Sequence, residues 1–342
     1  MLGKFPDKAA ILAVDGGASK IDVALVGANG SVLAAVRQRA PANFNFGHEP
    51  PLEALDAAIR RAGAEAGLGH DSGLVAQVGI FCLAGDDLPI DDRRIARLVR
   101  GGRWVDTVLL RNDTFAILRA GTDRGWGVAV VCGSGLNCAG VGPDGRVVRF
   151  PALGELSGDL AHGGGWLGRA ALGAAVRARD GRGMRTDLET LVPRHFDMAR
   201  PTSVMEALYT GALDGRRMLE LGPIVFGAAR RGDAVSRRLI AMLGDEVVAT
   251  ANAAIRRLHL TRRAFDVVLG GGIFRSGDGL LMSQVRQGIK AVAPEAALRR
   301  LDVPPLLGAA LMGLDAVKSG NAARTRLRKE LTEARLRRAR AG

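Results

Sequence analysis

The sequence contains little cysteine, few aromatic residues and no long apolar run. Its three cysteines, Cys82, Cys132 and Cys138, are too few for a disulfide framework and lack the paired spacing of a zinc site. No apolar stretch approaches the roughly 20 residues that a membrane-spanning helix needs. The first residues also lack the pattern of a secretory signal. We therefore expect a cytoplasmic protein with reduced thiols and no membrane partner.

Acidic residues are outnumbered by basic ones, and the formal net charge of the 342 residues is +13. More than half of this excess lies between Lys318 and Gly342, where nine Lys or Arg accompany two Glu. This pattern predicts a basic tail over residues 319–342, in the form of a frayed helix that could contact RNA or an anionic surface. Aromatic residues make up only 4% of the chain, which is too few for base stacking. We do not expect nucleic acid to be a partner, and the role of the tail is left open.

A hydrophobic content of 47% with charges of both signs predicts a globular protein, and the length predicts two domains. A strand, a glycine turn and further strands begin near residue 10 and again near residue 127, each time followed by helices and strands in alternation. We expect two α/β halves that face each other across a cleft. The first domain would span 1–120 and be completed by a helix at 305–318. The second would span 121–304 and contain a helical insertion.

The first glycine turn joins two apolar strands within Ile11–Leu25. Asp15 ends the first strand, and its carboxylate would suit a hydrated Mg²⁺ on bound phosphates. The turn itself contains Gly16, Gly17, Ser19 and Lys20. Glycines permit backbone angles that a Cβ forbids, and such a turn can present N–H groups, a hydroxyl and an ammonium to a phosphate. An ordinary hairpin is the alternative, because Gly-Gly turns join strands in many β proteins.

Two further glycine turns follow buried strands. The second turn contains Gly133, Ser134 and Gly135. It has the same form as the first, and two such turns together favour a polyphosphate ligand. The third turn contains Gly270, Gly271 and Gly272. A flat group such as adenine could lie against its bare backbone. A hairpin and a helix-entry turn are the respective alternatives.

Asn112 and Asp113 stand between an apolar strand at Thr107–Leu110 and a helix expected at Thr114–Ala120. Asp is a good helix cap, so a capping carboxylate is one interpretation. The other interpretation is a general base, because phosphoryl transfer to a hydroxyl needs a carboxylate within hydrogen-bond reach of that hydroxyl.

Taken together, these motifs resemble those of the actin/hexokinase-type ATPase superfamily. Within it, the chain is most similar to the BadF/BadG/BcrA/BcrD-type ATPase family, and there to the N-acetylglucosamine kinases. The resemblance covers residues 10–317 and rests on VDGGASK, Asn112-Asp113, VVCGSGLN, VVLGGGIFRS and PPLLGAALMG, which occur in the order of the family. It implies two actin-like ATPase (ribonuclease H-like) domains, ATP and Mg²⁺ as cofactors, and phosphate transfer to a sugar.

The resemblance also implies a role for each matching residue. Asp15 corresponds to the acid that organises Mg²⁺, and Asp113 to the base that accepts the proton of the sugar hydroxyl. The phosphate-binding positions are Gly16, Gly17, Ser19, Lys20, Gly133, Ser134 and Gly135. The adenosine-binding positions are Gly270, Gly271 and Gly272. The sugar-binding positions are Asn43, Asn112, Asn137 and Asp159.

Five positions depart from the family pattern, namely Ala18, Ser19, Cys132, Leu136 and Leu160. Ala18 and Leu136 alter the two phosphate turns, and Leu160 replaces the glutamate that usually follows the sugar-binding aspartate. The expected reaction is ATP-dependent phosphorylation of an amino sugar, with conversion of N-acetylglucosamine to N-acetylglucosamine 6-phosphate as the leading case. An activator-type ATPase and a non-catalytic sensor of nucleotide or sugar are alternatives. The acceptor sugar and the oligomeric state, including a homodimer, are left open.

Overall fold

The computed structural model describes residues 9–39, 51–68 and 74–338. The chain divides into two compact units. One unit comprises the chain up to Ala129 together with the chain from Leu301 onward, and the other comprises Val130–Arg300. Among the helices of the described residues, none combines the length and the apolar character needed to cross a membrane.

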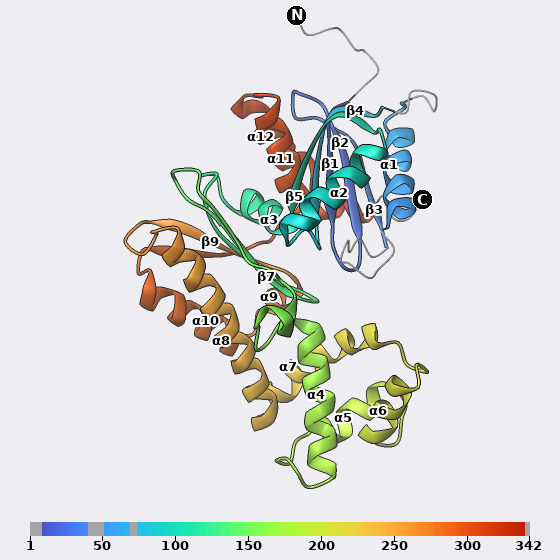
Figure 1. Ribbon diagram of the computed structural model, residues 1–342, viewed down its shortest axis with the longest axis vertical. Helices are drawn as coiled ribbons and strands as arrows, with labels where there is room; N and C mark the ends of the chain where they lie inside the picture. Colours follow the sequence, from blue (N-terminus) through green and yellow to red (C-terminus); the bar gives the residue numbers. More distant parts are fainter. Residues whose placement is uncertain (1–8, 40–50, 69–73, 339–342) are drawn as a thin grey trace, which may run out of the picture. The chain divides into compact units, whose positions relative to one another are not determined.

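The sheet of the first unit has the strand order β3-β2-β1-β4-β5 (Figure 1). Its strands are β1 (Ala9–Gly16), β2 (Ile21–Val26), β3 (Val32–Gln38), β4 (Ala76–Leu83) and β5 (Val105–Asn112). β1, β2 and β3 pair antiparallel, whereas β1, β4 and β5 pair parallel. β1 lies at the centre of the sheet. Its consecutive residues Leu12 and Ala13 are buried in different cores, because successive side chains of a strand point to opposite faces of the sheet.

Helices cover both faces of this sheet. The core on one face includes side chains of α1 (Leu52–Glu65) and α2 (Pro89–Gly101). The core on the other face includes side chains of α3 (Asp113–Gly121) and α11 (Leu306–Ala316). Since α11 comes from the C-terminal part of the chain, the first unit needs both ends of the sequence to bury its sheet.

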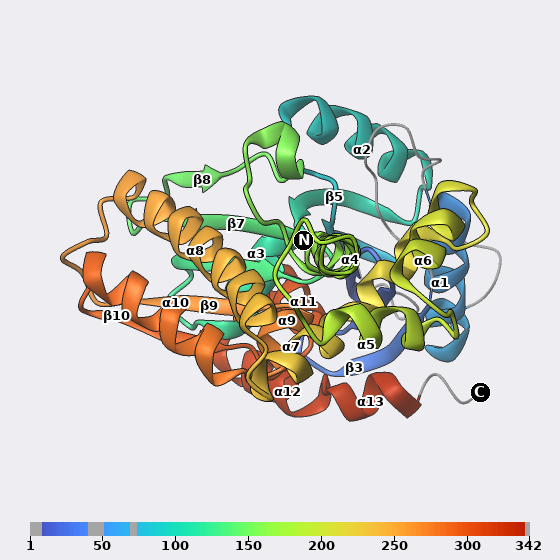
Figure 2. The ribbon, with the colours of Figure 1, turned by 90° about the horizontal axis from the view of Figure 1, so that it is seen from below.

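The segment after residue 318 also packs onto the first unit. It forms α12 (Asn321–Glu330) and α13 (Glu333–Arg338), and Figure 2 shows α13 beside β3, which it contacts. The buried apolar side chains of this segment are Ala323, Leu327, Leu331 and Leu336. They lie in the core that contains α11. The expectation of a frayed helix was therefore wrong, because the charge count hides apolar residues at helical spacing.

The second unit repeats the strand order of the first. Its sheet runs β10-β9-β6-β7-β8, so the strand that comes first in sequence is again central. The strands are β6 (Gly127–Cys132), β7 (Leu136–Val141), β8 (Val147–Arg149), β9 (Phe265–Gly270) and β10 (Ala296–Arg300). This repetition confirms the predicted α/β class with two sheets.

Helices of the second unit form two groups. α8 (Ala234–Arg257) and α10 (Gly279–Val292) pack against each other and against strands of the sheet. The other long helices are α4 (Gly164–Arg179), α5 (Leu188–His195), α6 (Pro201–Tyr209) and α7 (Gly222–Arg230). α4 packs on α5, α6 and α7, and α7 also packs on α8, which joins the two groups. The short helix α9 (Gly272–Arg275) follows β9 directly.

Candidate active site

Strand register brings several polar groups to one edge of the first sheet. β1, β4 and β5 are parallel, so their carboxyl ends meet at the same edge. Asp15 pairs with Cys82 on β4, and Asn112 at the end of β5 pairs with the residue after Cys82. Asp113 follows immediately as the first residue of α3. The two carboxylates predicted from distant motifs are thereby close enough to influence each other.

Asp113 is half-buried, and its environment disfavours the ionised form. Burial, together with the charges of Asp15 and Asp87, raises the pKa of Asp113 to about 7. Hydrogen bonds from backbone N–H groups, including that of Thr114, oppose this shift. A carboxylate with a pKa near neutrality accepts a proton more readily than an ordinary aspartate does. This raised pKa is compatible with a general base, and that role of Asp113 stays a prediction.

Asp15 lies deeper, with 7% of its surface exposed. Burial is the main cause that raises its pKa to about 7, and Asp22 adds to the shift while Lys20 and Arg37 oppose it. The described residues contain no group of three or more His, Cys, Asp or Glu arranged to hold a metal. The single carboxylate of Asp15 nevertheless fits Mg²⁺, because proteins usually bind this ion through one or two carboxylates together with substrate phosphates and water.

Asn112 is the N-cap of α3 and is almost completely buried. Its Oδ1 accepts hydrogen bonds from the backbone N–H and the hydroxyl of Thr114, at 3.0 and 2.6 Å. Its Nδ2 donates to the backbone oxygen of Asp86 at 3.3 Å and to Oδ1 of Asp87 at 2.9 Å. These contacts fix the start of α3 and with it the position of Asp113. The sugar contact expected for Asn112 stays a prediction.

The acidic pair Asp86-Asp87 was missed by the sequence analysis. Asp86 and Asp87 follow β4, are both buried, and Asp87 contributes to the raised pKa of Asp113. Cys82 lies on the same strand, and its pKa is raised by burial and by the charges of Asp15 and Asp113, so its thiol stays protonated. Two consecutive acids just beyond a buried strand, separated from it by Ala84 and Gly85, were the signal that could have identified this pair.

The first glycine turn is closed by a hydrogen bond from the Gly17 N–H to the Lys20 oxygen, at 3.0 Å. Gly16 and Gly17 do not adopt positive φ, and a Cβ on Gly17 would meet no atom within 4 Å. The expectation that these glycines supply forbidden backbone angles was therefore wrong. What Gly17 leaves is open space beside the backbone. Ser19 is exposed, and the Lys20 ammonium lies 2.5 Å from a carboxylate oxygen of Asp22.

The second glycine turn is held by the N-terminus of α4. Within the turn, the Gly133 N–H donates to the Gly135 oxygen at 2.9 Å. The N–H groups of Gly164 and Gly165 donate to the oxygens of Gly133 and Ser134, at 2.8 and 2.9 Å. These bonds use carbonyl groups of the turn and fix its path, while Ser134 is half-buried and Gly135 is exposed.

Two glycines make this close packing sterically permissible. Gly163 has a φ of +88°, and a Cβ there would lie 2.5 Å from the Gly135 oxygen. Gly271 has a φ of +100°, and a Cβ there would lie 2.3 Å from the Cys132 oxygen. Both positions therefore require glycine. The third glycine turn thus packs on the second, as does Gly163, whose segment the sequence analysis did not assign to the site.

The predicted sugar residues of the second unit lie in different elements: Asn137 is half-buried in β7, and Asp159 lies in the segment that precedes α4. Asp159 accepts a hydrogen bond from the Ser157 hydroxyl at 3.1 Å, and Asn137 Oδ1 accepts from the Cys138 N–H at 2.7 Å. Glu246 of α8 accepts from the N–H of Leu160 at 3.2 Å. Burial and the nearby charge of Asp159 raise the pKa of Glu246. Glu246 thus supplies a carboxylate near Asp159, although residue 160 is leucine.

The fourth sugar position, Asn43, lies outside the described residues.

Comparisons with known proteins converge on one family. The sequence model of the BadF/BadG/BcrA/BcrD ATPase family matches residues 12–319. The chain is 24% identical over 269 residues to the N-acetylmuramic acid/N-acetylglucosamine kinase of Clostridium acetobutylicum. This match covers 78% of this chain and 86% of that relative. It is also 25% identical over 327 residues to the N-acetyl-D-glucosamine kinase of Dictyostelium discoideum. This second match covers 91% of this chain and 99% of that relative.

Among solved structures, a candidate N-acetylglucosamine kinase from Chromobacterium violaceum has a TM-score of 0.71 with this chain at 22% identity. The match covers 90% of this chain and 100% of the other. At this level of identity the likeness establishes a shared fold.

Proposed function

Because the chain belongs to the BadF/BadG/BcrA/BcrD ATPase family, we propose that it is an ATP-dependent sugar kinase that acts on N-acetylglucosamine. The product would be N-acetylglucosamine 6-phosphate. The names of the two curated relatives support this substrate, since both include N-acetylglucosamine. The observation that carries the proposal is the pair of carboxylates, Asp15 and Asp113, at one edge of the first sheet.

Asp113 is the general base in this proposal. As the sugar oxygen attacks the γ-phosphorus of ATP, Asp113 takes the proton of that hydroxyl. A new oxygen–phosphorus bond forms, and the bond between the γ-phosphorus and the bridging oxygen of ADP breaks. The pKa of about 7 keeps a useful fraction of Asp113 ionised at neutral pH while leaving it basic enough to accept the proton. Asn112 supports this role by fixing the first turn of α3.

The remaining residues bind the two substrates. Asp15 would hold Mg²⁺, which neutralises charge on the phosphates when it is bound with ATP. We assign the phosphates to Gly16, Gly17, Ser19, Lys20, Gly133, Ser134 and Gly135. We assign adenosine to Gly270, Gly271 and Gly272. We assign the sugar to Asn43, Asn112, Asn137 and Asp159. The open space beside Gly17, Gly133 and Gly135 supports their part, because a phosphate can approach such backbone closely.

The test is release of ADP from Mg²⁺-ATP by the purified protein with a panel of sugars. The panel contains N-acetylglucosamine, N-acetylmuramic acid, N-acetylmannosamine, glucosamine and glucose. We expect N-acetylglucosamine to stimulate ADP release most strongly, with one sugar phosphate formed per ADP. Hydrolysis that is independent of sugar would favour an activator-type ATPase. Binding of nucleotide or sugar without ADP release would favour a sensor.

A further inference from the structure

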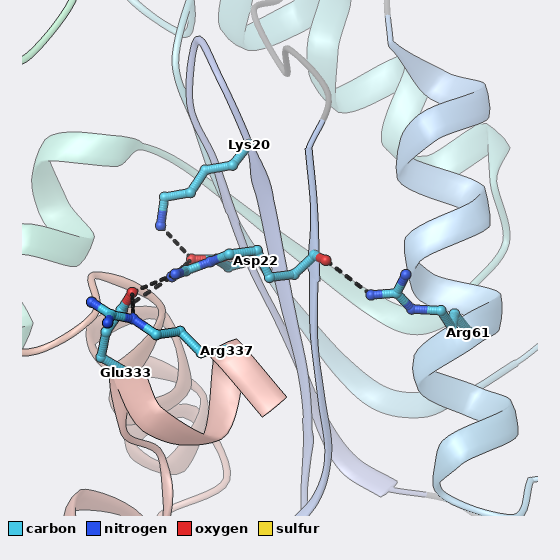
Figure 3. A network of polar contacts seen from close by, with 6 residues as sticks. Lys20, Asp22, Arg61, Glu333 and Arg337 are labelled. Atoms are coloured by element: carbon cyan, nitrogen blue, oxygen red, sulfur yellow. Dashed lines mark hydrogen bonds and ion pairs between the residues drawn. The ribbon is translucent and has the colours of Figure 1, made fainter. Parts of the chain in front are cut away.

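A chain of ion pairs connects the first glycine turn to the C-terminal helix (Figure 3). Asp22 of β2 is completely buried and lies at its centre. Its Oδ2 accepts from the Lys20 ammonium at 2.5 Å. Its two oxygens also accept from Nε and Nη2 of Arg37 on β3, each at 2.7 Å. Asp22 therefore has two cationic partners, of which only Lys20 belongs to the turn.

Arg37 in turn has a second carboxylate partner. Its Nη1 and Nη2 donate to the two oxygens of Glu333 on α13, the latter at 3.1 Å. The hydrogen bond with Arg37 lowers the pKa of Glu333, which is therefore ionised at neutral pH. Arg337 also approaches Glu333, at 3.6 Å, but its side chain is 73% exposed and largely screened by solvent. Glu333 lies beyond residue 319, where the match to the family ends.

The balance of charge links Glu333 to Lys20. With Lys20 in place, and apart from the exposed Arg337, two cations and two anions form the network. If Lys20 leaves, the guanidinium of Arg37 alone must serve both Asp22 and Glu333. A buried carboxylate that loses a cationic partner is destabilised. The negative charge of Glu333 thus strengthens the hold of Asp22 on Lys20.

We propose that Glu333 is a positioning residue that, through Arg37 and Asp22, retains the Lys20 ammonium at Asp22 and so makes the phosphates of ATP compete for it. The C-terminal helix then weakens the affinity of the first glycine turn for its anionic ligand. This inference rests on the proposed function, because it takes Lys20 to be a phosphate-binding residue. It adds a determinant of ATP affinity that lies outside the matched part of the chain.

The first test is the KM for ATP of the Glu333→Gln variant. Removing the charge leaves Arg37 to balance Asp22 alone, so Lys20 becomes available and the KM falls about two- to fivefold, the range expected for a partly exposed ion pair. kcat changes little. Glu330→Gln is the matched control, because it removes the same charge from the same segment and Glu330 binds the Val32 N–H and not Arg37. An unchanged KM in Glu333→Gln would overturn the proposal.

A variant with the opposite effect sharpens this test. Arg37→Gln leaves Lys20 as the only cationic partner of buried Asp22, so the KM for ATP rises. A fall in the KM of this variant would contradict the assigned direction of the coupling. Thermal melting of each variant shows whether the chain is folded, and only folded variants enter the comparison.

A second readout does not depend on activity. The sequence has six lysines, so trace acetylation followed by mass spectrometry can follow Lys20 individually. Lys20 acetylates faster in Glu333→Gln than in the wild-type protein or in Glu330→Gln, while Lys290 in the second unit serves as an internal reference. Equal rates at Lys20 in all three proteins would refute the inference. Absence of ADP release by the wild-type protein with any sugar would instead refute the proposed function, so the two failures are distinguishable.

Discussion

Asp113 is the residue on which the proposed reaction depends most directly. In Asp113→Asn the hydrogen-bonding shape is kept and the proton acceptor is lost. We expect kcat to fall by about 10²- to 10⁴-fold, the usual contribution of a general base, while ATP binding is retained. Steady-state kinetics and calorimetric titration with ATP measure the two effects. Asp106→Asn is the control, since Asp106 is exposed on the preceding strand. Near-normal turnover in Asp113→Asn would exclude Asp113 as the base.

The raised pKa of Asp113 also predicts how the rate depends on pH. Only the ionised carboxylate accepts a proton, and burial together with Asp15 and Asp87 raises its pKa to about 7. kcat/KM should therefore increase with pH and reach half of its maximum near pH 7. A pH profile of kcat/KM with saturating sugar measures this limb. The residual activity of Asp113→Asn should lack the limb, and a wild-type profile that is flat across neutrality would contradict the assignment.

The same two carboxyls affect stability in the opposite sense. The pKa values of Asp15 and Asp113 are raised from 3.8 to about 7, so the folded chain binds these protons more tightly than the unfolded chain does. Their stabilising contribution is present below about pH 4 and is lost as the pH rises through 7. The free energy of unfolding of Asp15→Asn should therefore decline less over this interval than that of the wild type. Urea denaturation at several pH values, without nucleotide, measures the two slopes, and parallel slopes would contradict the prediction.

At the scale of elements, the packing of the third glycine turn on the second gives a separate prediction. Gly271→Ala would force a Cβ against the Cys132 oxygen and strain a backbone with φ of +100°. We expect a loss of about 1–3 kcal/mol in the free energy of unfolding, together with weaker ATP binding. Gly133→Ala is the matched control, because a Cβ there meets no atom within 4 Å. Its stability should be unchanged. Equal stability of both variants in chemical denaturation would count against the packing argument.

Most elements of the two sheets could be predicted from the sequence because their local signals are strong. The sequence has apolar runs at Val75–Leu83 and Phe265–Leu269, where β4 and β9 form. Apolar residues recur at helical spacing over Leu52–Ala66, where α1 forms. The last helices were obscured because basic residues outnumber the apolar ones that α12 and α13 bury. The net charge of a segment describes all of its residues together, so it does not reveal that a helix can bury one narrow apolar face.

The candidate site was predictable only where a short motif carried its chemistry. Asp15 lies at the end of one recognisable strand, and Asp113 directly follows another. Glu246 stands beside Asp159 because α8 passes that loop, and no local pattern indicates this contact. The partnership of Arg37 and Glu333 joins residues 296 positions apart, which only the folded chain brings together.

At the scale of the whole molecule, the first unit depends on the last helices for part of its core. Leu327 is fully buried among residues of the central strand and α11. Leu327→Ala should reduce the free energy of unfolding by about 2–5 kcal/mol through the cavity that it leaves. Arg326→Ala, at the neighbouring half-exposed position, should have a much smaller effect. Thermal and chemical denaturation compare the two, and equal losses would show that α12 is not part of the core.

The docked C-terminal helices also close one side of the first sheet. β3 is an edge strand, and its Val32 N–H and oxygen are bound by the side chains of Glu330 and Arg335, at 2.8 and 2.6 Å. The Arg37 oxygen accepts from Arg61 of α1, at 2.9 Å. An unprotected edge strand is a template for adding a strand from another chain. A protease that cut the chain ahead of α12 would therefore have two effects. It would release the restraint on Lys20, and it would expose the edge of β3 to pairing with a strand of another molecule.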